Sequence, residues 1–258
     1  MITDTVVKKI ILYTGLIIFL GGGGVPVTSA QTIQKLDNGS IILENFQQDK
    51  VGTLPAGWYN RDGDKQVVNY GSEEQAKYKY AVESEKGNKF LRYKGMQAMH
   101  INFPLINHEK NNVYGINIKN TPILSWKWRV FDLPKGANED ESNLNDTAAS
   151  IYVVFDFGRV LFKKVPKTIR YTWSSTLPKG TELSKFFGNQ KIIVLESGTE
   201  NTGKWISMHR NIVEDYKRLF GDDPPETPVA ILLLSDGDST NSLAEADYDD
   251  IMLKPEGN

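Results

Sequence analysis

The stretch Asn145-Asp-Thr-Ala-Ala-Ser-Ile-Tyr-Val-Val-Phe-Asp-Phe-Gly158 decides the fold class. Four apolar side chains fall on one face at a period of two residues: Ile151, Val153, Phe155 and Phe157. Tyr152 and Val154 make the opposite face partly apolar as well. A strand with apolar side chains on both faces is usually covered on both sides. The sequence therefore predicts a strand in the middle of a sheet rather than at its edge.

Two further segments alternate strictly between apolar and polar side chains, which predicts strands with one buried face. In the first segment, the apolar face carries Leu124, Trp126, Trp128 and Val130, and the polar face carries Ser125, Lys127 and Arg129. In the second, the apolar face carries Ile169, Tyr171 and Trp173, and the polar face carries Arg170, Thr172 and Ser174. The tryptophans on these apolar faces are interpreted as core residues.

The rest of the chain repeats the strand pattern with one exception. Strands are expected at residues 41–46, 66–70, 99–103, 191–196, 229–235 and 248–253, and a hairpin is expected from Tyr78 to Lys94. The exception is a helical spacing shared by Trp205, Met208, Ile212, Tyr216 and Leu219, with Gly221 as a stop signal. The predicted fold is one all-β domain over residues 31–258, an antiparallel β-sandwich of jelly-roll type with one packed amphipathic helix.

Composition and the N-terminus indicate a compartment. The 258 residues include no cysteine, which excludes disulfides and thiolate chemistry, and the net charge of −2 implies no general attraction to nucleic acid.

Lys8 and Lys9 precede an apolar run from Ile10 to Leu20, and Thr28-Ser29-Ala30 has small residues where a signal peptidase cuts. Residues 1–30 are therefore predicted to be a signal peptide, with an uncleaved membrane anchor as the alternative. The mature protein is expected to be periplasmic or secreted, without stable membrane insertion.

A set of ordered motifs carries a family resemblance. The motifs are Leu124-Ser-Trp-Lys-Trp-Arg129, Asp146-Thr-Ala-Ala-Ser-Ile-Tyr-Val-Val-Phe155, Ile169-Arg-Tyr-Thr-Trp-Ser-Ser175, Glu196-Ser-Gly198, Arg210-Asn211, Glu214-Asp-Tyr216 and Asp236-Gly-Asp238. Together they resemble a bacterial family catalogued as domain of unknown function 3047. The resemblance implies an exported bacterial protein and no particular activity. The segments Glu44-Asn45-Phe46, Gly57-Trp58 and Asp249-Asp250-Ile251-Met252-Leu253 also resemble the ends of carbohydrate-binding and galactose-binding jelly-roll domains.

The polar side chains of the alternating strands are the first candidate site. If the strands share a sheet, one face would gather arginines, carboxylates and a tyrosine, which suits a sugar or an acidic glycan. The candidate ligand-binding residues are Arg129, Tyr152, Asp156, Arg170 and Glu196, with Trp58 as an exposed platform in a turn. The alternative is a solvated face with cross-strand ion pairs.

A second candidate site is the loop Asp236-Gly-Asp-Ser-Thr-Asn241, which is followed by further aspartates. Carboxylate and amide oxygens around a glycine suit Ca²⁺, which takes six to eight oxygen ligands. A structural calcium ion is predicted, with Glu44, Asp236, Asp238 and Asp249 as its ligands. The alternative is a polar turn in which the side chains bond their own backbone.

The leading functional hypothesis is a non-catalytic binding module for a glycan or another polar ligand. Two alternatives come from other classes. One is a glycan hydrolase or lyase, although the Glu-x-Asp-x-x-Glu pattern common in jelly-roll glycosidases is absent from the sequence. The other is a structural or assembly protein of the cell envelope, which would expose a large apolar patch to its partner.

Overall fold

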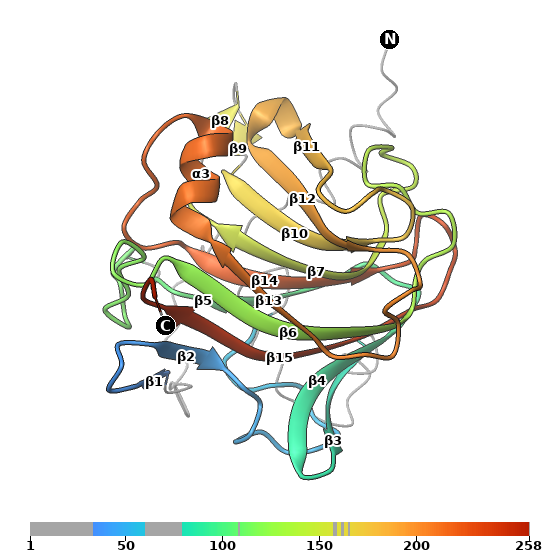
Figure 1. Cartoon of the computed structure of the whole chain (residues 1–258), viewed down its shortest axis with the longest axis horizontal. Helices are drawn as coiled ribbons and strands as arrows, with labels where there is room; N and C mark the ends of the chain where they lie inside the picture. Colours follow the sequence, from blue (N-terminus) through green and yellow to red (C-terminus); the bar gives the residue numbers. More distant parts are fainter. Residues whose placement is uncertain are drawn as a thin grey trace.

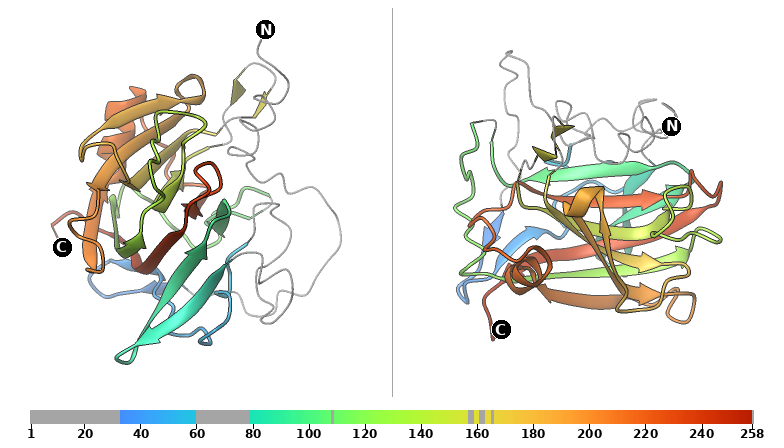
Figure 2. Two further views of the ribbon diagram at one scale, coloured as in Figure 1. Left: turned by 90° about the vertical axis from the view of Figure 1, so that its right-hand side faces the viewer. Right: turned by 90° about the horizontal axis from the view of Figure 1, so that it is seen from above.

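The computed structural model describes residues 33–59, 79–107, 109–156, 159–160, 163–164 and 166–257. Two predicted segments, the signal peptide at residues 1–30 and the strand at Gln66–Tyr70, lie outside the described residues. The described part of the chain is built almost entirely from strands, and Figures 1 and 2 show them arranged in two stacked layers. The predicted class, an all-β sandwich of jelly-roll type with a packed helix, is confirmed.

The first layer, sheet A, has seven strands, and its long central strand β15 pairs with β2, β4 and β6. The strands of sheet A are β1 (Gln34–Lys35), β2 (Ile41–Glu44), β3 (Tyr80–Glu85), β4 (Asn88–Gly95), β6 (Ile123–Asp132), β13 (Ile206–Asn211) and β15 (Ala244–Lys254). The predicted hairpin between Tyr78 and Lys94 is the β3–β4 pair, which extends to the bottom of Figure 1. All pairings in sheet A are antiparallel among the described residues.

The second layer, sheet B, has six strands in the order β11-β12-β10-β7-β14-β5. They are β5 (Met99–Pro104), β7 (Thr147–Val154), β10 (Thr168–Ser174), β11 (Glu182–Lys185), β12 (Gln190–Ser197) and β14 (Ala230–Asp236). The predicted central strand is β7, which lies between β10 and β14 with all of its side chains buried, whereas Phe157 and Gly158 of the predicted stretch lie outside the described residues. One pair, β10 and β12, is parallel. A separate two-stranded ribbon consists of β8 (Arg159–Val160) and β9 (Lys163–Lys164).

The core lies between the two sheets and is rich in aromatic rings. Trp126 of β6 contacts Tyr171 of β10 with ring centroids 5.6 Å apart, and Trp128 contacts Trp173 at 6.1 Å. All three tryptophans are buried, as their place on the apolar faces predicted. Because neighbouring side chains in a strand point to opposite faces, Arg129 and Arg170 point away from this core. We call the face of each sheet that points away from the other sheet its outer face.

Helix α3 (Ile212–Phe220) is shorter than the sequence pattern suggested. The segment that contains Met208 forms the edge strand β13, which pairs with β6, so the predicted helical start near Trp205 is wrong. The helix begins after Asn211, whose side chain accepts hydrogen bonds from the backbone N–H groups of Val213 and Glu214, and it ends at Gly221 with φ 78°. In the part of the chain that the structure describes, no helix is both long and apolar enough to cross a membrane.

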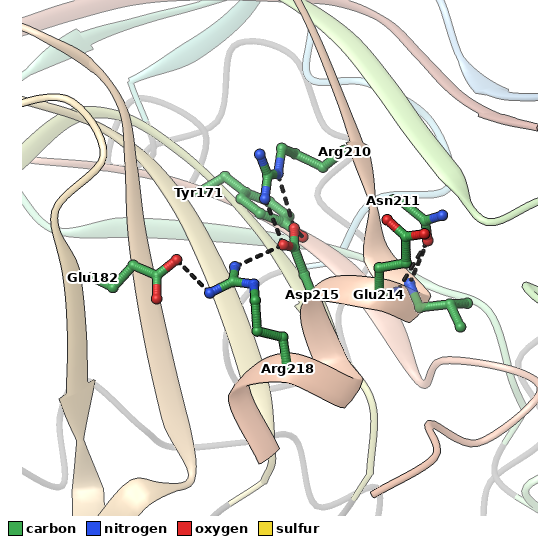
Figure 3. Close-up of polar contacts among 8 residues, drawn as sticks. Tyr171, Glu182, Arg210, Asn211, Glu214, Asp215 and Arg218 are labelled. Carbon is green, nitrogen blue, oxygen red and sulfur yellow. Dashed lines mark hydrogen bonds and ion pairs between the residues drawn. The ribbon is translucent and has the colours of Figure 1, made fainter. Parts of the chain in front are cut away.

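A buried carboxylate attaches α3 to sheet B, as Figure 3 shows. Asp215 accepts hydrogen bonds from Arg210 of β13 (2.8 Å), from Arg218 (2.9 Å) and from the hydroxyl of Tyr171 (2.9 Å). Burial opposes the ionisation of Asp215, but the hydrogen bonds and charges of the two arginines outweigh it, so the pKa of Asp215 is lowered. Arg218 also donates to Glu182 of β11. One aspartate therefore joins a helix, an edge strand and the second sheet.

We expect Asp215→Asn to lower the free energy of unfolding by about 2–4 kcal/mol, because it removes the carboxylate partner of Arg210 and one of the two carboxylate partners of Arg218. The matched control is Asp223→Asn, which removes an exposed ion pair with Lys217 and should cost less than about 1 kcal/mol. Urea unfolding at several pH values measures both. Because the pKa of Asp215 is lowered in the folded state, its stabilisation is present at neutral pH and is lost as the pH falls through that pKa. A deficit of Asp215→Asn that stays constant into acid would contradict this account.

Candidate functional site

Two of the predicted ligand-binding residues, Tyr152 and Arg170, lie side by side on the outer face of sheet B. The guanidinium carbon of Arg170 lies 5.7 Å from the centroid of the Tyr152 ring. Arg170 donates to the hydroxyl of Ser150 and to the side-chain oxygen of Asn145, both at 2.9 Å. The exposed fractions are 1% for Arg170 and 5% for Tyr152, and burial raises the pKa of Tyr152 to about 12. Both side chains therefore face protein groups rather than solvent.

The other predicted members of this face lie elsewhere. Arg129 is on the outer face of sheet A, on the opposite side of the sandwich. Asp156 follows the end of β7, where it accepts a hydrogen bond from the backbone N–H of Lys167. Glu196 is near the end of β12 and pairs with Lys179 at 3.4 Å. The predicted single polar face is thus divided between two sheets, because alternation fixes which side of a strand is polar but not which sheet the strand joins.

Trp58 is not an exposed sugar platform. Its exposed fraction is 1%, and its ring packs against Phe46 and Phe103 with centroid distances of 6.4 and 5.6 Å. Its indole N–H donates to a carboxylate oxygen of Glu44 at 3.0 Å. Burial raises the pKa of Glu44 to about 7. The side chain of Trp58 therefore points into the core, and the prediction that Trp58 is an exposed platform for a sugar is wrong.

The four predicted calcium ligands do not form one group. Asp236 and Asp238 lie together, and Asp146 joins them, with one carboxylate oxygen from each within 4.8 Å of the others. Burial and the two neighbouring carboxylates raise the pKa of Asp236 to about 8. Glu44 is committed to Trp58, and Asp249 accepts a hydrogen bond from Asn88 at 2.8 Å on sheet A. Asp146 was not predicted as a ligand, although it stands directly before the central strand β7.

The outer face of sheet A holds a compact charged cluster around Asp247 of β15. The side chain of Asp247 is fully buried, and two arginines from the neighbouring strands bracket it. Arg92 of β4 donates to both carboxylate oxygens at 2.7 and 2.9 Å, and Arg129 of β6 donates from Nε to Oδ2 at 2.9 Å. Arg129 also pairs with Glu85 of β3 at 2.9 Å. Four neighbouring strands therefore contribute to one network, which fixes both guanidinium groups.

Three aromatic rings surround the two arginines. The guanidinium carbon of Arg129 lies 4.6 Å from the ring centroid of Trp205, 4.9 Å from Phe131 and 5.3 Å from Phe90, which is the geometry of cation–π contacts. Arg92 lies over Phe131 as well, at 4.9 Å. Phe131 is exposed, and Arg92 and Trp205 are partly exposed, whereas the rest of this group is buried. We call Arg92, Arg129, Asp247, Phe90, Phe131 and Trp205 the arginine–aromatic cluster.

An open hollow of ≈ 520 Å³ lies beside this cluster along strand β6. Its lining includes Ser125, Lys127, Ser207, His209 and Asp250, which supply hydroxyl, imidazole and charged groups. Lys127 pairs with Asp250 at 2.7 Å, and both side chains remain partly exposed. The lining also includes apolar side chains, those of Ile123, Trp126, Met208 and Met252. Because Ser125, Lys127 and Arg129 alternate on the same face of β6, the hollow and the arginine–aromatic cluster are neighbours on one surface of mixed polar and apolar character.

The outer face of sheet A went unrecognised because its parts are distant in the sequence. Arg129 was predicted as a ligand residue, but Phe90, Phe131, Trp205 and Arg92 were not. Trp205 was assigned to a helix and Phe90 only to a hairpin strand. A signal was available in the alternation of β6, since Phe131 shares the face of Lys127 and Arg129.

The strand pairing and the two outer faces define an all-β sandwich protein with a polar and aromatic surface on one sheet and an acidic cluster at the other. The chain belongs to the family described as "Protein of unknown function (DUF3047)", which matches residues 58–252 and thus more than half of the sequence. The sequence resemblance to this family is thereby confirmed. No curated protein matches the chain.

Several solved structures are similar in outline. The family 11 carbohydrate-binding module of a cellulosomal cellulase from Clostridium thermocellum is 11% identical, with 88% of this chain and 96% of that chain covered and a TM-score of 0.35. SGBP-B from a xyloglucan utilization locus in Bacteroides uniformis is 12% identical, with 83% and 49% covered and a TM-score of 0.33. The wild-type ENZbleach xylanase is 9% identical, with 88% and 98% covered and a TM-score of 0.35.

Because Arg170 is buried and hydrogen-bonded, we expect Arg170→Ala to destabilise the fold. The substitution empties a buried volume and leaves Ser150 and Asn145 without their donor, which should cost about 2–4 kcal/mol. Thermal and urea unfolding measure the loss. The control is Lys119→Ala, which removes an exposed 3.5 Å pair with Glu226 and should change stability by less than about 1 kcal/mol. An Arg170→Ala variant as stable as the wild type would show that this arginine is free for another role.

Proposed function

We propose that the protein is a non-catalytic binding module for a glycan or another polar ligand, and that the ligand lies on the outer face of sheet A. The observation that carries this proposal is the arginine–aromatic cluster, in which the partly exposed Arg92 lies over the exposed ring of Phe131 and half-buried Trp205 lies over the neighbouring Arg129. A sugar ring presents hydroxyl groups around its edge and C–H groups on its faces. A binding surface for it therefore needs rigid hydrogen-bonding groups next to flat apolar ones.

The cluster meets the requirement for rigidity. Arg92 and Arg129 share Asp247, and the three aromatic rings limit where the guanidinium groups can move. Side chains that are already fixed lose little conformational entropy when a ligand binds, which improves affinity. The planar guanidinium group can also donate two parallel hydrogen bonds to neighbouring oxygens. The side chain of Arg92 is 28% exposed, so it can reach a ligand while it keeps its bond to Asp247.

The hollow extends the proposed site along β6 and β13. Its serine, lysine and histidine side chains offer additional donors and acceptors in line with the cluster. A surface of this length suits several linked sugar units better than one small molecule. We further propose that the module acts in the periplasm or outside the cell, since residues 1–30 have the charged, apolar and small-residue regions of a signal peptide.

One observation favours a second candidate function, glycan hydrolysis. Asp247 and Asp249 are two residues apart on β15 and therefore point to the same face. Burial, together with the charge of Asp250, raises the pKa of Asp249 to about 6, whereas Asp247 is paired with two arginines. Two carboxylates in such different environments can divide the roles of acid and base. Binding remains our first proposal because Asp247 is fully buried and saturated by arginines.

A glycan-array screen of the full chain, followed by calorimetry on the strongest hit, tests the proposed site. We expect Trp205→Ala to raise the dissociation constant by about tenfold or more, which corresponds to about 1.4 kcal/mol, because it removes an aromatic surface next to Arg129. The matched control is Phe187→Ala, which removes an aromatic ring that is 87% exposed in the turn after β11 and should leave binding unchanged.

Arg129→Lys adds a second test, since lysine keeps the charge but lacks the planar fork and should weaken binding as well. A folded Trp205→Ala variant that binds as tightly as the wild type, or the absence of binding to every glycan, would contradict the proposal. Intact glycan recovered after incubation supports a binding module. Shortened products that disappear in Asp249→Asn would establish the hydrolase instead.

A further inference from the structure

The three aspartates near the ends of β7 and β14 form a second site of a different kind. Asp146 stands immediately before β7, Asp236 is the last residue of β14, and Asp238 lies in the loop that follows. One carboxylate oxygen from each lies within 4.8 Å of the other two. Asp146 and Asp236 are completely buried, whereas Asp238 is exposed. The group therefore opens to solvent on the side of Asp238.

An independent observation is an unsatisfied oxygen inside this group. The Oδ2 atom of Asp236 is buried and has no hydrogen-bond partner among the described residues, although its Oδ1 atom accepts from the backbone N–H of Asp238 at 3.1 Å. A buried carboxylate oxygen without a donor costs free energy, and such atoms are rare in folded proteins. The unsatisfied oxygen belongs to the carboxylate that faces Asp146 and Asp238, so a bound cation would supply the missing partner.

The surrounding charges do not supply it. Within the described ranges, neither Asp146 nor Asp236 has an ion pair with a lysine or arginine. Arg170 of β10 donates from two of its nitrogens to Ser150 and Asn145, and its Nη2 atom is buried with no hydrogen-bond partner among the described residues. The loop after β14 holds Asp146 in place. The carboxylate of Asp146 accepts hydrogen bonds from the backbone N–H of Thr240 at 2.6 Å and from the Thr240 hydroxyl at 2.7 Å. Asp146 and Asp236 are thus fixed close together, and no lysine or arginine of the described ranges forms an ion pair with either.

We propose that Asp146, Asp236 and Asp238 bind a divalent cation, with Ca²⁺ as the ion that the donor set fits best. All three donors are carboxylate oxygens, which are typical ligands of hard cations, and the group contains neither histidine nor cysteine. Ca²⁺ accepts six to eight oxygens in a flexible arrangement, so water and loop oxygens can complete its shell on the exposed side. A cation here would join the start of β7, the end of β14 and the loop after it.

The first experiment compares thermal unfolding of the full chain in chelator and in excess CaCl₂. We expect calcium at about 100 times its dissociation constant to raise Tm by about 5–10 °C. Isothermal calorimetry on the folded protein should give one site per chain. The shift should be lost or strongly reduced in Asp236→Asn and in Asp238→Asn. The exposed position of Asp238 makes its variant the one that should fold without difficulty.

The matched control is Asp222→Asn, which removes an exposed carboxylate paired with Lys167 and should keep the full calcium shift. No calcium binding by the wild type, or an equal Tm shift in Asp238→Asn, would overturn the proposal. An equal response to MgCl₂ that is also lost in Asp238→Asn would keep the site and overturn the preference for calcium. Because the proposed glycan surface is on sheet A, either proposal can fail while the other holds.

Discussion

The aromatic contacts between β6 and β10 join the two sheets at the centre of the molecule. Trp126 packs on Tyr171 and Trp128 packs on Trp173. Alternate side chains of β6 in sheet A are therefore buried against alternate side chains of β10 in sheet B. Large aromatic side chains bury the most apolar surface per residue and fix how the sheets face each other. The indole N–H of Trp173 donates to the carbonyl of Gly198, whereas those of Trp126 and Trp128 find no hydrogen-bond partner in the described part of the chain. Burial of apolar surface therefore outweighs two unmade hydrogen bonds.

This core determines which side chains each outer face receives. Once the tryptophans of β6 point inward, Arg129 must point outward, and Arg170 follows in the same way from Tyr171 and Trp173 on β10. The two arginines nevertheless meet different surroundings. On sheet B, Glu139 accepts from the hydroxyls of Thr172 and Ser174 at 3.3 and 2.6 Å, so these two hydroxyls are covered and paired. On sheet A, Arg92 stays partly exposed beside exposed Phe131, which is the surface that we propose for a ligand.

The sequence was sufficient for the strands but not for the sheets. A period of two identified β6, β7 and β10, because it depends only on the direction of neighbouring side chains. It gave no information on which strands are neighbours, so Arg129 and Arg170 were placed on one face. The helical spacing that includes Met208 led to a predicted helix start that is too early. Alternate residues of β13 also pack on the core, so their apolar spacing can be mistaken for that of a helix. The true start of the helix depends on the cap formed by Asn211. Asp236 and Asp238 could be grouped because they are close in sequence, whereas Asp146 joins them only through the pairing of β7 with β14.

One hydrogen-bonded residue in the core connects the two proposed sites. Tyr248 follows Asp247 on β15 and therefore points inward, where its hydroxyl lies 2.9 Å from that of Ser235 and donates to the carbonyl of Leu234. Ser235 is in turn followed by Asp236. Because neighbouring side chains of β15 point to opposite faces, Asp247 points toward the arginines and Tyr248 points into the core, where it contacts β14, the strand that ends in Asp236. Buried ion pairs add little to stability by themselves. We therefore attribute to the pairing of Asp247 with the arginines a role in fixing the positions of these side chains. Tyr248 holds β15 against β14, and both sites depend on that fixed backbone for the positions of their carboxylates.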